Sequence, residues 1–315
     1  MGAESTPAAA AITLRGVSKH YAALRAVDGV DLEVRRGEVF GLIGHNGAGK
    51  STLFKMMLGL VLPTTGQIHI AGEPVSGRGF RAVRRQVGYL PENVVLWDNL
   101  SGLETLRFLA RLKGAPASDC ASALDRVGLA QVAARPVREY SKGMRQRLGF
   151  AQALLGAPQV LLLDEPTAGL DPQAIRAFYD TLAGLRAQGV TIVLSSHILA
   201  ELQVRVDRLA VLSNGRVQAL GSVQQLREQQ DLPLTVLLRL AADDVPAAEQ
   251  ALAALPGAGL VPQRVADGLR LRCPRAAKVT LLQALAPLGA RLLDVQVIEP
   301  SLEDLFFGGP AREVH

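Results

Sequence analysis

Three glycines, a lysine and two hydroxyl side chains stand together in the segment GHNGAGKST, which begins at Gly44. Because Gly44, Gly47 and Gly49 have no Cβ, their backbone N–H groups can come close to a phosphate chain. Lys50 supplies a positive charge for the β and γ phosphates, and the hydroxyl of Ser51 suits a magnesium ion. The spacing is that of the G-x-x-x-x-G-K-[ST] phosphate loop. A flexible turn that ends by chance in Lys-Ser is the alternative, and the strand and helix predicted on either side argue against it.

Two carboxylates, Asp164 and Glu165, directly follow the apolar run Gln159–Leu163. Such a run is typical of a strand buried on both faces, and ligands bind at the carboxyl ends of the strands in an open parallel sheet. Asp164 is expected to hold magnesium, and Glu165 to act as general base or to position the water that attacks the γ-phosphate. Alone, the pair would be better interpreted as a solvated strand cap. The intact phosphate loop favours the catalytic interpretation.

A third segment, REYSKGMRQRLGF, places Ser141 at the N-cap of a predicted helix that carries apolar residues at helical spacing. Gly156 is the predicted stop of this helix. Locally this is a well-capped surface helix. The N-terminus of such a helix is also an anion site, which is the functional interpretation.

Short apolar segments alternate with helical patterns up to about residue 225, which predicts an α/β domain with a largely parallel sheet. The buried strands expected in it are Glu38–Ile43, Gln159–Leu163 and Val190–Ser195. After Gln230 the pattern changes to the βαββαβ order of a small ferredoxin-like sandwich. The elements expected there are Leu234–Leu240, Pro246–Leu255, Leu260–Val265, Leu269–Cys273, Ala276–Leu288 and Arg291–Ile298.

The composition excludes several classes of protein. Cys120 and Cys273 form no C-x-x-C pair, so neither a disulfide framework nor a zinc site is predicted, and a reducing cytoplasm fits best. No apolar run approaches the roughly 18–20 residues that cross a bilayer, and the N-terminus lacks the basic region of a signal peptide. The charges, 34 basic and 29 acidic, give +5 and are spread along the chain, so no direct nucleic-acid partner is expected.

The phosphate loop, YSKGM, LLLDEPTAGLDP and SSH occur in this order and resemble the nucleotide-binding subunits of ATP-binding-cassette (ABC) transporters over about residues 11–225. The resemblance implies a P-loop NTPase fold of the ABC type, with ATP and Mg²⁺ as ligands. The domains expected are a flexible N-terminus (1–10), an ATPase domain (11–228) with a helical subdomain (about 93–155), and a C-terminal α+β accessory or dimerisation domain (233–309).

The resemblance also implies roles for single residues. Tyr21 would stack on the adenine, and His197 would be the switch histidine that touches the γ-phosphate. Ser141 and Gly143 would close on the ATP of a second subunit, and Asp171 would be the D-loop aspartate. The implied nucleotide-binding set is Tyr21, Gly44, Asn46, Gly47, Ala48, Gly49, Lys50, Ser51, Thr52, Ser141, Gly143 and Asp171. The implied catalytic pair is Glu165 and His197, and the implied metal set is Ser51, Asp164 and Glu92.

Two positions depart from the commonest pattern of the family. YSKGM replaces the frequent LSGGQ, and Glu92 stands where many members have the Q-loop glutamine. Both forms are familiar in the exporter branch, and a carboxylate oxygen of Glu92 can still meet magnesium.

The partners implied by the family are a second copy of the chain, paired head to tail, and separate membrane permease subunits whose helices dock near the Glu92 loop. The chain would then be peripheral on the cytoplasmic face of the bacterial inner membrane. A narrower resemblance, in GYLPENVVLWDNLSGLETLRFLARLKG, REYSKGMRQRLGFAQALLG and PSLEDLF, is to the NosF subunits that assist copper-site maturation of nitrous oxide reductase. It implies a periplasmic accessory protein.

Two other interpretations stay open. One is the ATPase of another ABC-2 exporter, for a drug or a polysaccharide. The other is a soluble ABC ATPase that acts on DNA or the ribosome. Such proteins usually carry a long coiled-coil insertion or two cassettes, and this chain has neither a sustained heptad run nor a second phosphate loop.

Overall fold

The computed structural model describes residues 10–229, 233–253, 255, 260–299 and 306. The chain divides into two compact units, Met1–Val223 and Gln224–His315, and each has its own hydrophobic core. The predicted flexible N-terminus lies outside the described residues except for Ala10, which begins a strand. The tail PSLEDLF also lies outside them, except for Phe306.

Two sheets build the first unit. One is antiparallel, with strand order β2-β1-β4-β5; the other has the order β10-β9-β3-β8-β7-β6 and is parallel except for β10. The strands are β1 (Ala10–Tyr21), β2 (Leu24–Arg35), β3 (Val39–Ile43), β4 (Thr65–Ile70), β5 (Glu73–Pro74), β6 (Val87–Leu90), β7 (Val160–Leu163), β8 (Thr191–Ser196), β9 (Arg208–Ser213) and β10 (Arg216–Gly221). The three buried strands predicted from the sequence are therefore present, with bounds shifted by one residue.

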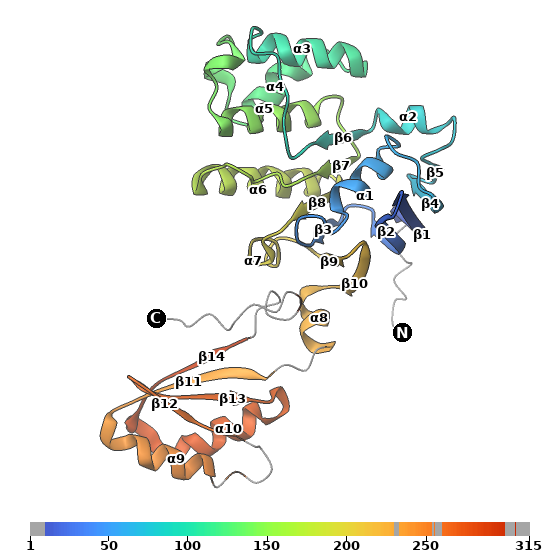
Figure 1. The fold of residues 1–315 in the computed structure, drawn as a ribbon. Helices are drawn as coiled ribbons and strands as arrows, with labels where there is room; N and C mark the ends of the chain where they lie inside the picture. Colours follow the sequence, from blue (N-terminus) through green and yellow to red (C-terminus); the bar gives the residue numbers. More distant parts are fainter. Residues whose placement is uncertain (1–9, 230–232, 254, 256–259, 300–305, 307–315) are drawn as a thin grey trace, which may run out of the picture. The chain divides into compact units, whose positions relative to one another are not determined.

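Helix α1 (Lys50–Met57) packs between the two sheets (Figure 1). Its Leu53, Phe54, Met56 and Met57 are at most 1% exposed and belong to one core cluster with side chains of both sheets. Burial of each such side chain stabilises the fold by about 1.5–3 kcal/mol. The start of α1, which follows β3 after the phosphate loop, is thereby held firmly in the centre of the unit.

Helices α3, α4 and α5 group together at one end of the first unit (Figure 1), where α5 also packs directly on β6 of the parallel sheet. Helix α6 lies beside α5. The ring of Phe150 in α5 packs on that of Phe178 in α6, with centroids 4.7 Å apart. A capping box of Ser101 and Glu104 starts α3, and Gly114 in the left-handed region ends it. The remaining helices of this unit are α2 (Phe80–Arg84), α3 (Gly102–Lys113), α4 (Asp119–Arg126), α5 (Lys142–Leu154), α6 (Pro172–Ala187) and α7 (Leu199–Leu202), with 3₁₀ turns at Ala130–Val132 and Val137–Glu139.

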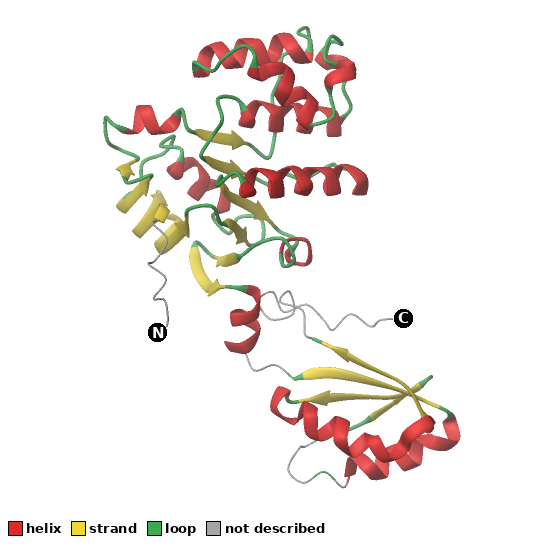
Figure 2. Ribbon diagram, turned by 180° about the vertical axis from the view of Figure 1, so that it is seen from behind, coloured by secondary structure: helices red, strands yellow, loops and turns green. Residues whose placement is uncertain are grey.

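In the second unit, helices α9 and α10 cover one face of a four-stranded antiparallel sheet of order β12-β13-β11-β14 (Figure 2). This order confirms the predicted βαββαβ sandwich. The elements are α8 (Val223–Gln229), which begins at the last residue of the first unit, β11 (Leu234–Leu240), α9 (Val245–Ala253), β12 (Gln263–Val265), β13 (Gly268–Cys273), α10 (Lys278–Leu285) and β14 (Leu292–Ile298), with 3₁₀ turns at Ala242–Asp244, Arg275–Ala277 and Ala286–Arg291.

Two predictions for this unit were wrong in extent. The strand expected from Leu260 covers only Gln263–Val265, and the helix expected over Ala276–Leu288 is α-helical only over Lys278–Leu285. Pro287 has no backbone N–H to continue the helix, and Gly289 takes non-helical angles (φ 51°, ψ −126°).

In the part of the chain that the structure describes, no helix combines the length and the apolar character that crossing a bilayer requires.

Candidate functional site

The phosphate loop runs from the end of β3, whose five residues are all buried, to the first turn of α1. Gly47 and Gly49 have φ of 82° and 106°, in the left-handed region that favours glycine. A Cβ at Gly49 would collide with the carbonyl oxygen of Ala26, and one at Gly44 with that of Leu212. The loop therefore needs glycine for two reasons, backbone angle and close approach of neighbouring strands.

Lys50 points back over this loop and is only 6% exposed. Its ammonium group donates to the carbonyl oxygen of Gly44 and lies 3.4 Å from Oε1 of Glu165. A buried cation needs such partners, because an unpaired charge in the interior is very costly. The positive charge expected from the sequence thus lies between the phosphate loop and the predicted catalytic carboxylate.

Glu165 is held from several sides. Its backbone has φ of +48°, which is rare for a residue with a side chain and is often found at active sites. Its Oε2 lies 2.8 Å from Nδ1 of His197, and its buried Oε1 has no hydrogen bond, only the ion pair with Lys50. The predicted catalytic pair is therefore in direct contact, and one carboxylate oxygen is available to a new partner.

Ser195 connects the carboxylate of Asp164 to the backbone of Glu165. Its hydroxyl donates to Oδ1 of Asp164 over 2.6 Å and accepts from the backbone N–H of Glu165 over 2.9 Å. Sequence reasoning quoted this serine only as part of SSH and gave it no role. Ser195 lies near the end of the buried strand β8, which pairs with β7. A hydroxyl at this place in a buried strand is the signal that could have identified it.

A cavity of about 540 Å³ opens over the phosphate loop. Ser51, Glu92 and Glu165 line it, so the structure brings these three predicted residues together with the loop. Leu24, Arg25 and Asn214 also line it and were missed. Asn214 lies in the Asn-Gly turn between β9 and β10 and has φ of 49°; this dipeptide is a strong hairpin signal in a sequence but says nothing of the neighbouring cavity. The predicted residues that line the cavity are Asn46, Gly47, Gly49, Lys50, Ser51, Thr52, Glu92 and Glu165.

Two carboxylates, Asp164 and Glu92, act on the ionisation of Tyr89. Burial raises its pKa to about 12, and the negative charges of Asp164 and Glu92 add to the effect. Asp164 itself is 2% exposed. The two carboxylates predicted for the metal therefore both act electrostatically on Tyr89, although they lie on different loops.

Ser141, Gly143 and Asp171 are not among the described residues that line this cavity. Ser141 is exposed and caps α5 by accepting from the N–H of Met144, and Asp171 is exposed and caps α6 by accepting from that of Ala174. The start of α5 lies on the loop that follows Glu165, because Gln146 donates to the carbonyl oxygen of Pro166 over 3.2 Å. The cap predicted for Ser141 is confirmed as local structure, and Asp171 is a second cap that was not predicted. The chain does not bring either residue to its own phosphate loop.

Tyr21 ends β1 and is 44% exposed, with the ammonium group of Lys19 5.1 Å from the ring centroid. It does not line the cavity, although Leu24, three residues on, does. Its ring is therefore open to a further flat partner.

The family model described as "ABC transporter" matches residues 27–168. The mouse "ATP-binding cassette sub-family A member 7" is 38% identical over 309 residues, and the alignment covers 94% of this chain but only 14% of that protein. "Daunorubicin resistance ATP-binding protein DrrA3" of Streptomyces coeruleorubidus is 35% identical over 94% of each chain. "Nod factor export ATP-binding protein I" of Ralstonia nicotianae is 40% identical over 71% of this chain and 70% of its own.

Two solved structures are similar as well. One is described as the ATP-binding subunit of an ABC transporter, with a TM-score of 0.65, 36% identity and coverage of 70% of this chain and 92% of that one. The other is a dimeric post-hydrolysis state of an ATP-binding cassette bound to ADP and Pi, with a TM-score of 0.63, 25% identity and coverage of 67% and 98%. Together with the loop, the paired carboxylates and the sheet order, these similarities show that the chain belongs to the ABC transporter family and carries the ATPase domain of that family.

Proposed function

We propose that this chain binds and hydrolyses ATP as one half of a head-to-tail dimer that drives a separate export permease. Support for the pairing comes from one observation above all. Ser141 and Gly143 have the sequence of a nucleotide-contacting loop, yet neither lines the cavity over their own phosphate loop. A second copy, turned head to tail, would supply them to the ATP of the first.

The chemistry follows from the contacts of Glu165. Its Oε1, which has no hydrogen bond and only the ion pair with Lys50, accepts a proton from the water that attacks the γ-phosphorus, while the bond from that phosphorus to the bridging β-phosphate oxygen breaks. His197, bonded to Oε2, holds the carboxylate in orientation. When ATP binds, its phosphate oxygens take the place of Oε1 as partners of the Lys50 ammonium group, and the ion pair between Lys50 and Glu165 is released.

The residues present fit a magnesium ion. Ser51 and Glu92 offer oxygen ligands in the cavity, and Asp164 adds a buried carboxylate. Among the described residues no group of three His, Cys, Asp or Glu side chains could hold a metal. This is consistent with Mg²⁺, which is typically bound by one or two carboxylates together with substrate phosphates and waters. When bound, the ion neutralises charge on the phosphates.

An exposed apolar cluster beyond the Glu92 loop is the proposed contact for the permease on the cytoplasmic face of the membrane. Val95, Trp97, Phe108 and Leu112 are 43–89% exposed, and the rings of Trp97 and Phe108 meet edge to face at 5.0 Å. Exposed apolar clusters of this kind typically mark interaction sites.

Export of an organic molecule is favoured as the transport role, because the similar proteins DrrA3 and the Nod factor ATPase are named for drug resistance and export. The narrower Nos-type role, in copper-site maturation with a periplasmic accessory protein, stays a prediction of the sequence resemblance. The neighbouring genes test it. A permease and a periplasmic β-helix-like protein beside a nitrous oxide reductase gene would support it, and a drug-resistance permease would exclude it.

The substitution Glu165→Gln tests the proposal directly. We expect ATP binding to be retained and phosphate release to be lost. An ATP-bound dimer should accumulate, which light scattering detects as a doubled molecular mass. Adding Ser141→Arg should abolish that dimer while each copy still binds ATP. The exposed Glu33→Gln is the matched control and should behave as the wild type. Unchanged phosphate release in Glu165→Gln would remove this residue from the mechanism.

A further inference from the structure

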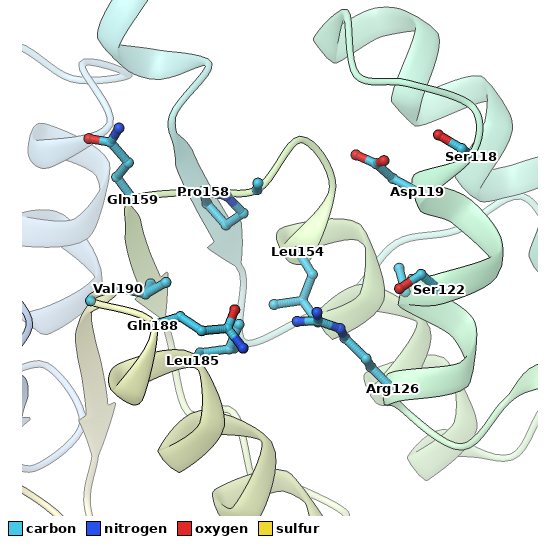
Figure 3. Close-up of a pocket in the computed structure, with 13 residues that line it drawn as sticks. Ser118, Asp119, Ser122, Arg126, Leu154, Pro158, Gln159, Leu185, Gln188 and Val190 are labelled. Carbon is cyan, nitrogen blue, oxygen red and sulfur yellow. The ribbon is translucent and has the colours of Figure 1, made fainter.

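A second cavity, of about 450 Å³, lies far along the chain from the phosphate loop, between α4, the turn from α5 to β7, and the end of α6 (Figure 3). This volume is within the range of small-molecule sites. The cavity has an apolar floor of buried residues, namely Ala123, Leu154, Pro158, Leu185 and Val190. An apolar floor with a few polar groups around it is the usual composition of a ligand pocket.

Two opposite charges stand on one wall of this cavity, both on α4. The guanidinium group of Arg126 is exposed, has no hydrogen bond or ion pair within the described residues, and points from α4 toward Leu154 and Gln188 (Figure 3). Asp119 uses Oδ2 to accept from the N–H of Gly156 over 3.2 Å, and its Oδ1 has no partner among the described residues. Both groups retain capacity for a ligand.

The spacing of these two residues along α4 indicates the length of a ligand that could reach both. Asp119 and Arg126 are seven residues apart, so they share one face of α4 and their Cα atoms are separated by about 10.5 Å along the helix axis. An extended peptide spans roughly 3.3–3.6 Å per residue, so about three residues cover this distance. We propose that the cavity binds a short peptide of about three residues, or a zwitterion of similar length, with its ammonium end at Asp119 and its carboxylate end at Arg126.

Further polar groups of the cavity suit the middle of such a ligand. Ser122 lies on α4 between the two charges, and Gln188 stands on the opposite side (Figure 3). Gln159 also lines the cavity, with its amide directed away from α4. The amide of Gln188 and the hydroxyl of Ser122 offer donors and acceptors for peptide groups. A Cβ built on Gly189, another lining residue, would meet no atom within 4 Å, so this side of the cavity is open.

The turn beside the cavity is under backbone strain, and side chains of α3 and α4 hydrogen-bond to its backbone. Gly156 and Ala157 both have positive φ, 73° and 46°, and the second of these is unfavourable for alanine. Asp119 holds the N–H of Gly156, and the ammonium group of Lys113 donates to the carbonyl oxygen of Leu155 over 2.7 Å. A ligand that engages Asp119 therefore acts on the turn that joins α5 to β7.

Helices α5 and α6 run from this cavity to Ser141 and Asp171, which the sequence resemblance places at the nucleotide of the dimer. Helix α5, of 13 residues, is capped by Ser141 and ends at Leu154; helix α6, of 16 residues, is capped by Asp171 and has Leu185 near its other end. A ligand that bridges α4 to the end of α6 would resist movement of α5 against α6. It would thus lower the turnover of the dimer without contacting nucleotide. This coupling, unlike the binding itself, rests on the proposed function.

Calorimetry tests the binding on the full chain, with trialanine, triserine and trileucine as probes. We expect one site per chain for at least one of them, and binding at least about tenfold weaker when its ends are acetylated and amidated, because each blocked end loses a charged hydrogen bond. Arg126→Gln and Asp119→Asn should weaken binding by a similar factor. Arg81→Gln, an exposed arginine of α2 that does not line the cavity, is the control.

Absence of binding by all three peptides, or equal binding of the blocked forms, would overturn the proposal. Ser122→Phe, which fills the cavity from an exposed position, should also abolish binding and checks that the peptide lies inside. The bound peptide should lower steady-state phosphate release of the wild type and leave that of Arg126→Gln unchanged. Binding without this effect would refute the coupling through α5 and α6. The Glu165→Gln chain should bind the peptide normally, so a failure here and a failure of the ATPase proposal are distinguishable.

Discussion

The hydroxyl of Ser195 lies 2.6 Å from Oδ1 of Asp164, and this single contact joins the ends of β8 and β7 at the site. The hydroxyl oxygen of Ser195 also accepts from the backbone N–H of Glu165. Ser195 is fully buried, so water cannot readily take over either hydrogen bond. The orientation of the Asp164 carboxylate and the position of the Glu165 backbone therefore depend on one buried hydroxyl.

Ser195→Ala should lower kcat and leave ATP affinity nearly unchanged. The substitution leaves the buried N–H of Glu165 without a partner, which costs about 1–3 kcal/mol. If this cost falls on the transition state, kcat decreases by roughly tenfold to a hundredfold. Steady-state phosphate release and nucleotide titration measure the two effects. Ser196→Ala is the matched control, since within the described part of the chain the hydroxyl of Ser196 hydrogen-bonds only to the backbone of Ile198. Equal kcat values for the two variants would refute the role of Ser195.

The glycines of the phosphate loop give a graded prediction. Gly47 and Gly49 both have positive φ, but a Cβ at Gly47 would meet nothing within 4 Å, whereas one at Gly49 would collide with the backbone of Ala26. Gly47→Ala should cost only the left-handed strain, about 1–2 kcal/mol. Gly49→Ala should in addition displace β2 from the loop and abolish ATP binding. Calorimetric titration with ATP separates the two, and similar affinities would show that the loop adapts.

The parts of the site that could be predicted from the sequence are those built from neighbours in the chain. The glycine spacing, the cap of α5, and the apolar run of β7 followed by two carboxylates are local patterns. Ser195 meets Asp164 across 31 residues, and its role follows only from the pairing of β7 with β8. The bounds of α10 were predicted too wide because apolar periodicity outweighed the effects of Pro287 and Gly289.

A second network links the loop after Glu165 to the helix after His197. Tyr179 donates to Oε1 of Glu201 over 3.2 Å, and Thr167 donates to Oε2 over 3.4 Å. Burial and the nearby carboxylate raise the pKa of Tyr179, so its hydroxyl stays protonated as the donor. Glu201→Gln should lower kcat by about tenfold, because a charged acceptor contributes more than a neutral one. ATP affinity should not change. A pure loss of thermal stability with normal kcat would show that Glu201 only supports the fold.

The lowered pKa of Lys113 should make the stability of the first unit depend on pH. Burial lowers the pKa of this lysine from 10.5 to about 8, although its ammonium group donates to Leu155. Between these two values the unfolded chain binds more protons than the folded chain, so this residue's contribution to the free energy of unfolding rises with pH across that window. Below about pH 8 the lysine is charged in both states, and its contribution is constant.

Comparison with Lys113→Met isolates this effect from other titrating groups. The fluorescence of Trp97, the only tryptophan, reports on α3 during urea unfolding because its ring packs on Phe108 of that helix. The free energy of unfolding of the wild type minus that of the variant should increase as the pH is raised from about 8 to about 10. Below about pH 8 this difference should not change with pH. Parallel curves for the two proteins over the whole range would mean that Lys113 titrates in the folded chain as it does in the unfolded one.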